Sequence, residues 1–84
     1  MGSAEKLLRR MRANPHDNWT MDNLLTIARR AAIEVRHHGG SHFVFSFPGL
    51  EEDVTVPFRR PIKPIYIKKF VALVDAVRKK EKKP

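Results

Sequence analysis

The stretch from Ile33 to Phe47, IEVRHHGGSHFVFSF, decides the fold of this chain. Apolar and polar residues alternate on both sides of a glycine pair, which is typical of two half-buried strands joined in a hairpin. We therefore expect strands over residues 33–38 and 42–47, with Gly39, Gly40 and Ser41 between them.

The length of this loop decides which side chains share a face, because a slip of one residue sends every side chain to the opposite face. A two-residue turn at Gly39-Gly40 would mix phenylalanines with charged residues. A three-residue loop ending at Ser41 instead pairs position 38 with 42, 36 with 44 and 34 with 46, and glycine supplies the positive φ that such a loop needs. This register predicts one apolar face, formed by Ile33, Val35, His37, Phe43, Phe45 and Phe47.

Helices are predicted on both sides of the hairpin. Thr20 resembles an N-cap, with Trp19 before it and Leu24 after it in a hydrophobic-staple pattern, and Pro64 suits the first turn of a last helix. We expect helices over residues 3–13, 20–32 and 64–79 and a third strand over residues 53–57.

These elements predict one α+β domain over residues 1–84. We expect a three-stranded antiparallel sheet with helices on its phenylalanine face. Without the extra N-terminal helix, the order α-β-β-β-α is that of a double-stranded-RNA-binding domain, although fold alone does not establish function.

The charge of the chain indicates its partners. Seventeen Lys and Arg residues against nine Asp and Glu give a formal charge of +8 in 84 residues, which favours a polyanion such as nucleic acid, or else an acidic protein. The chain has no cysteine, and no run approaches the roughly 20 apolar residues that span a bilayer. We expect a cytoplasmic protein that does not enter membranes.

The predicted register places His38 and His42 side by side on the open face of the sheet. An exposed imidazole can donate or accept a proton at neutral pH. RNA carries its own nucleophile, the 2′-hydroxyl, so its cleavage needs proton transfer and cations near the phosphate. One hypothesis is that His42 is a general acid or base, that His38 assists, and that Arg36, Arg59, Arg60 and Lys63 hold the phosphates, although the motif taken alone favours a surface or structural histidine.

Other interpretations of the histidines stay open. A histidine beside glycines in a hairpin is more often a surface or structural residue, and His16 is expected to be a solvated turn residue. Zinc is disfavoured because His37 and His38, as neighbours on a strand, point to opposite faces and no cysteine completes a ligand set. We expect neither a metal nor another cofactor.

The segment from Glu34 to Val77 resembles the HicA family of toxin-antitoxin mRNA interferases. The likeness rests on the ordered set Gly40-Ser41-His42 with Phe43-Val44-Phe45, then Pro48, Val54-Thr55-Val56-Pro57, and Ile62-Lys63-Pro64 before an apolar helix. The segment from Asn14 to Ala32 is similar to the extended amino-terminal half of some members.

The resemblance implies a metal-independent ribonuclease that cleaves single-stranded mRNA and is neutralised by a HicB-type antitoxin. It implies that His42 is catalytic, that Gly40 and Ser41 shape its loop, and that Lys63 is the lysine before the last helix. Two positions depart from the family: Phe58-Arg59-Arg60 replaces an Arg-His pair, and Phe43 replaces a histidine that often follows the motif. The alternatives are a non-catalytic RNA-binding module that uses the same basic face, and a protein that docks on an acidic partner.

Overall fold

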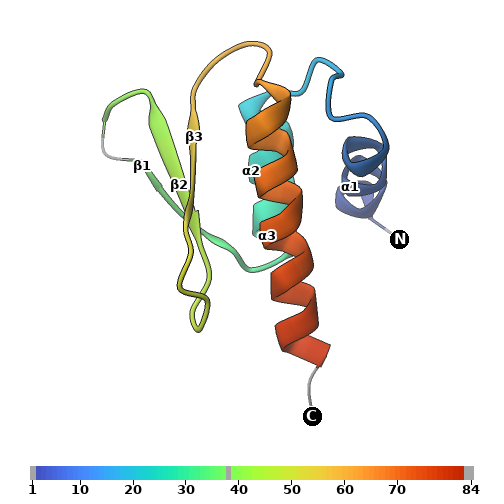
Figure 1. Cartoon of the computed structure of the whole chain (residues 1–84), viewed down its shortest axis with the longest axis vertical. Helices are drawn as coiled ribbons and strands as arrows, with labels where there is room; N and C mark the ends of the chain where they lie inside the picture. The colour runs from blue at the N-terminus through green and yellow to red at the C-terminus, as the bar shows by residue number, and fades with distance from the viewer. Residues whose placement is uncertain (1, 38, 83–84) are drawn as a thin grey trace.

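The computed structural model describes residues 2–37 and 39–82 and shows a small α+β domain, as the sequence predicts. Figure 1 shows a sheet on one side of the molecule, α2 and α3 beside it, and α1 beyond those helices. The elements are α1 Ser3–Ala13, α2 Met21–Arg30, β1 Glu34–His37, β2 His42–Ser46, β3 Val54–Pro57 and α3 Pro64–Lys82.

The three strands form one antiparallel sheet in the order β1-β2-β3. Glu34 pairs with Ser46 and Arg36 pairs with Val44, which confirms the register of the three-residue loop. Gly39 has a φ of 77°, the positive value expected for a glycine in this turn. The predicted pair of His38 with His42 lies outside the described residues.

β2 and β3 are each one residue shorter than predicted. β2 ends at Ser46 rather than at residue 47, since Phe47 begins a turn in which its carbonyl oxygen accepts a hydrogen bond from the Leu50 amide at 3.0 Å. Gly49 has a φ of 92° in that turn, and the Lys80 side chain of α3 lies against it. The β2–β3 turn is therefore held beside the C-terminal end of α3.

The second helix begins as predicted and ends two residues early. Thr20 is the N-cap, and its hydroxyl accepts a hydrogen bond from the Asn23 amide while the Asn23 side chain accepts one from the Thr20 amide. The predicted end at residue 32 is wrong because Ala32 has a φ of 61°. Ile33 then donates to the Ala28 carbonyl at 2.9 Å, which closes a Schellman motif and also removes Ile33 from β1.

The third helix begins at Pro64 as predicted but continues to Lys82 instead of ending at residue 79. The added residues are lysines and a glutamate, which are good helix formers, and basic side chains at a helix C-terminus suit its dipole. Within the described part of the chain, no helix is both long enough and apolar enough to span a lipid bilayer.

The core lies between the sheet and the helices, but it covers only part of the predicted apolar face. Phe45 is completely buried and meets Phe70 of α3 edge-to-face, with 5.1 Å between ring centroids. Val35, by contrast, is 36% exposed, and His37 is exposed as well. The prediction that both belong to the core is wrong, because β1 is an edge strand and the helices that bury Phe45 on the middle strand do not cover Val35 and His37.

The segment between α1 and α2 is fastened to the loop before α3. Trp19 is 4% exposed and its indole donates to the Asn14 carbonyl at 2.8 Å, so it is a core residue, as its position in the staple pattern predicts. The Trp19 carbonyl accepts a hydrogen bond from the Ile62 amide at 3.0 Å. α1 is joined to α3 by two ion pairs, Arg12 with Asp75 and Glu5 with Arg78, each with a closest contact of 2.6 Å.

The left-handed residue at the end of α2 predicts a stabilising substitution. An alanine in this conformation is strained by about 1–2 kcal/mol, whereas glycine adopts it freely at an entropic cost of about 0.5–1 kcal/mol. We expect Ala32→Gly to raise the free energy of unfolding by about 0.5–1 kcal/mol in urea titrations. The matched control is Ala31→Gly, which should destabilise because Ala31 has an ordinary φ of −87°. A loss of stability in Ala32→Gly would contradict this account of the helix end.

The ion pair between α1 and α3 predicts a dependence of stability on pH. Hydrogen bonds from Arg12 hold the pKa of Asp75 below its ordinary value. The pair therefore stabilises the protein above the unfolded-state pKa of about 4, and this contribution is lost as the pH falls through the lower pKa of the folded state. Both side chains are more than a third exposed, so its size is at most about 1 kcal/mol.

We expect Asp75→Asn to unfold at a lower urea concentration than wild type at pH 7, and at nearly the same concentration near pH 2. Glu52→Gln replaces an exposed carboxylate. The difference between its unfolding urea concentration and that of wild type should not shrink in this way between pH 7 and pH 2. A difference between Asp75→Asn and wild type that is equally large at both pH values would show that charge pairing is not its cause.

Candidate functional site

The hairpin end of the sheet brings the predicted catalytic residue and most of the predicted cations to one end of the molecule. His42 is the first residue of β2 and pairs with Pro57, the last residue of β3. Beyond this pair, the Phe58 amide donates to the Ser41 carbonyl. The end of the β1–β2 turn therefore lies beside the start of the connection after β3.

His42 lies on the face of the sheet opposite Phe45, as the register predicts. Its side chain is exposed, and among residues 2–37 and 39–82 no hydrogen bond to its ring is recorded. An imidazole in this position is open to solvent and to a ligand approaching the hairpin. His38, predicted to stand beside it, lies outside the described residues.

The predicted loop residues leave room for such a ligand. A Cβ atom built on Gly40 would meet no other atom within 4 Å, so this part of the loop is open space. The Gly40 carbonyl accepts a hydrogen bond from Nε2 of His37 at 2.6 Å, and Ser41 is held by its bond to Phe58. Gly40 and Ser41 thus lie in an exposed loop whose backbone is held by hydrogen bonds from His37 of β1 and from Phe58 after β3.

Arg36 shares the open face with His42 but is directed away from it. Its guanidinium lies 3.4 Å from a carboxylate oxygen of Asp53, at the other end of the sheet. In the register, Asp53 falls level with Ser46, about 13 Å along β2 from His42 at 3.3 Å per residue. Arg36, predicted to help hold the phosphates, therefore has its guanidinium paired with Asp53 in this structure, and its contact with phosphate stays a prediction.

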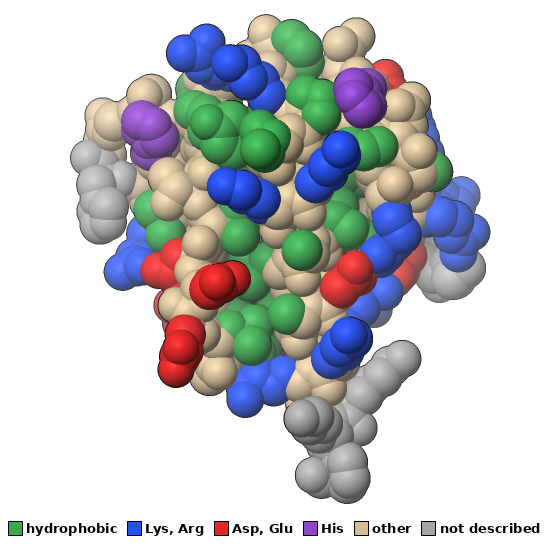
Figure 2. All heavy atoms as spheres, viewed as in Figure 1, with side chains coloured by type: hydrophobic (Ala, Val, Ile, Leu, Met, Phe, Trp, Pro, Cys, Tyr) green, Lys and Arg blue, Asp and Glu red, His purple; other side chains and the backbone are tan. Residues whose placement is uncertain are grey.

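Arg59, Arg60 and Lys63 lie in the connection between β3 and α3, which starts at the hairpin end. All are exposed, and the ion pairs found in the described part of the chain do not include them. At the opposite end, the β2–β3 turn carries Glu51 and Glu52. Figure 2 shows this separation in part: several acidic side chains lie at the lower left of the view and basic side chains surround an apolar area nearer the top, while acidic and basic side chains lie side by side elsewhere on this face.

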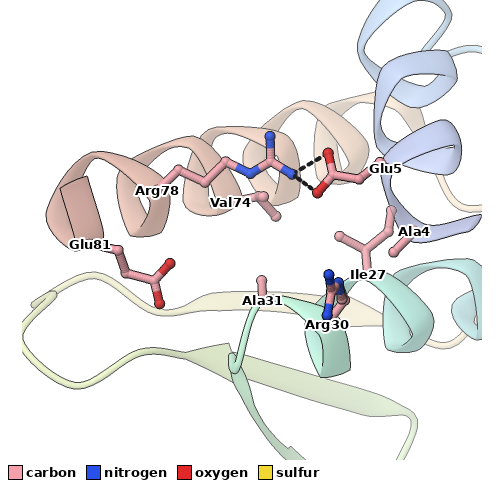
Figure 3. A pocket seen from close by; sticks show the side chains of 8 residues that line it. All are labelled: Ala4, Glu5, Ile27, Arg30, Ala31, Val74, Arg78 and Glu81. Carbon is pink, nitrogen blue, oxygen red and sulfur yellow. Dashed lines mark hydrogen bonds and ion pairs between the residues drawn. The ribbon is translucent and has the colours of Figure 1, made fainter. Parts of the chain in front are cut away.

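A hollow that does not include these residues lies between the three helices. Figure 3 shows Arg78 binding both carboxylate oxygens of Glu5 there, with Arg30 and Glu81 around them. The contact with Arg78 holds the pKa of Glu5 below its ordinary value. Because the two acids and two bases of this hollow balance one another, it has little attraction for an anion.

His16 is exposed in the turn after α1, as predicted. The described histidines and carboxylates do not form any group of three that would fit a metal ion.

An aromatic cluster at the hairpin end was not predicted from the sequence. The rings of His37 and Phe43 stack on the helix side of the sheet, and Phe58 lies against Phe43. The register itself placed His37 opposite Phe43, so the signal was present. The cluster was not predicted because helices were expected to cover the whole phenylalanine face of the sheet.

Comparison of the chain with protein-family models found no match, and comparisons with curated proteins and with solved structures found none either.

Proposed function

We propose that this protein is a metal-independent endoribonuclease that cleaves single-stranded mRNA, with His42 as its catalytic residue. The observation that carries the proposal is the exposed imidazole of His42 at the same end of the sheet as Arg59, Arg60 and Lys63. The order α2-β1-β2-β3-α3 supports a double-stranded-RNA-binding-like fold. The HicA-like motif set from Gly40 to Pro64 supports a toxin of that family.

The chemistry requires little machinery from the protein. The 2′-oxygen of one nucleotide attacks the adjacent phosphorus, the bond from phosphorus to the 5′-oxygen breaks, and the products carry a 2′,3′-cyclic phosphate and a 5′-hydroxyl. One proton leaves the 2′-hydroxyl and one arrives at the 5′-oxygen. His42 performs one of these transfers, and the nearby cations stabilise the extra negative charge on the phosphorus oxygens.

We propose that the same end of the sheet is the surface that an antitoxin covers. A basic, partly apolar surface around a catalytic histidine fits an acidic partner, because opposite charges steer and align the two surfaces. A HicB-type antitoxin is the partner that the motif resemblance favours. Its binding would block access of RNA to His42.

Replacing His42 tests the catalytic assignment. We expect His42→Ala to cleave mRNA in EDTA about 10²- to 10⁴-fold more slowly than wild type, the range ascribed to a positioned acid or base. His16→Ala is the matched control, since His16 is exposed but lies in the turn after α1, and it should cleave as wild type does. A single 2′-deoxy nucleotide at the cut position should abolish cleavage there.

Equal cleavage by wild type and His42→Ala would refute the role of His42, and cleavage abolished by EDTA would refute metal independence. Salt-sensitive RNA binding with no cleavage by wild type would instead identify a non-catalytic RNA-binding module.

The unpaired cations predict the dependence of RNA binding on salt. For a single strand, the slope of log K against log salt concentration falls by about 0.7 for each phosphate contact. We expect the slope for Arg59→Gln/Arg60→Gln to be less steep, closer to zero by about 1.4 than that of wild type. Lys6→Gln/Lys79→Gln removes the same charge from exposed positions on α1 and α3, and should change it much less. Equal slopes for the two double variants would show that RNA responds only to net charge.

A further inference from the structure

Three aromatic rings form a connected surface at the hairpin end, on the face opposite His42. The rings of His37 and Phe43 are parallel within 6°, with centroids 4.1 Å apart. Phe58 lies on the other side, with its centroid 5.9 Å from that of Phe43 and its plane tilted by 55°. Phe58 is 52% exposed and His37 is exposed too, whereas Phe43 between them is half-buried. The outer two rings therefore present apolar area to solvent.

This aromatic surface is held in place before any ligand arrives. Nε2 of His37 donates to the Gly40 carbonyl, which fixes the imidazole plane against Phe43. Phe58 is anchored through its backbone amide, which donates to Ser41. Because the rings are already ordered, the protein loses little conformational freedom when a flat ligand stacks on them.

The charge around the rings indicates which flat ligand they fit. Arg59 and Arg60 follow Phe58 directly and are exposed, while Glu51 and Glu52 lie at the far end of the sheet. Aromatic rings beside unpaired cations are the combination that binds single-stranded nucleic acid, in which bases stack and phosphates meet positive charge. A duplex keeps its bases stacked inside and offers no free base face to such a surface.

We propose that His37, Phe43 and Phe58 form a stacking site for unpaired bases of the RNA strand. The inference rests on the proposed function in taking that strand to be the one that His42 cleaves. The open space around Gly39 and Gly40 allows the strand to cross the hairpin tip, so that bases lie on the aromatic side while a neighbouring phosphate reaches His42 on the other. The stacked bases position the strand for cleavage.

The test measures RNA binding in the His42→Ala background, so that cleavage does not consume the probe. The probes are a labelled oligouridylate and the same strand with abasic ribose at its central positions, which has equal charge but fewer bases. We expect Phe58→Ala to weaken binding of the intact strand by about 5- to 100-fold, and binding of the abasic strand by less than about twofold. Ile65→Ala is the matched control, because Ile65 is an apolar side chain without a ring that is 57% exposed on α3.

Two further variants separate stacking from a change in structure. Phe58→Trp should bind the intact strand at least as tightly as the parent, since a larger ring stacks better. Phe58→Leu keeps an apolar side chain without a ring face and should bind as weakly as Phe58→Ala. If Phe58→Ala does not give the parent's far-ultraviolet circular dichroism, the comparison of Phe58→Leu with Phe58→Trp decides the question.

Equal weakening of intact and abasic strands, or no effect of Phe58→Leu, would overturn the stacking site. So would a polyglutamate peptide that competes with RNA and shows the same dependence on Phe58, since that result identifies a surface for an acidic protein. The proposed nuclease can fail separately: wild type that never cleaves RNA refutes it even where base-dependent binding persists, and His42-dependent cleavage without base-dependent binding refutes the stacking site alone.

Discussion

The register of the β1–β2 hairpin is the constraint on which both the core and the candidate site depend. Side chains alternate along a strand, so a slip of one residue would exchange the positions of His42 and Phe43. The same slip would move Phe45 away from Phe70, its buried partner. The short glycine loop with its positive φ at Gly39 therefore fixes two things together. Stability selects the register, and the register places the imidazole on the open face.

The antiparallel sheet also separates the charged residues of two of its loops. A three-stranded meander brings the β1–β2 turn and the end of β3 to one end of the sheet, and the β2–β3 turn to the other. The cations after Phe58 thus share an end with His42, while Glu51 and Glu52 occupy the opposite end. α3 spans this distance, from Pro64 near the basic end to Lys80 against Gly49. The separation of these loop charges therefore follows from the topology and does not require long-range contacts between the charged side chains.

Features set by a few neighbouring residues could be predicted from the sequence better than features set by packing between elements. The hairpin register, the Thr20 cap, the buried Trp19 and the start of α3 at Pro64 each follow from a few neighbouring residues, and the structure confirms them. The end of α2 could not be predicted in this way, since alanine rarely adopts the left-handed conformation found at Ala32. The direction of Arg36 was equally hidden, because Asp53 approaches it only through the pairing of β3 with β2.

The largest error concerns the apolar face of the sheet, and its physical cause bears on function. Alternation predicts which residues share a face, but it does not show how far the helices extend over that face. Ile67, Phe70 and Val74 of α3 are completely buried with Phe45 and Val56, while the rings of His37 and Phe58 remain outside this cover. Burying those rings would stabilise the fold, so leaving them exposed has a cost in free energy. Apolar side chains are expected to stay outside the core where a surface serves another purpose. Here the exposed rings lie at the end of the sheet that carries His42 and the unpaired cations.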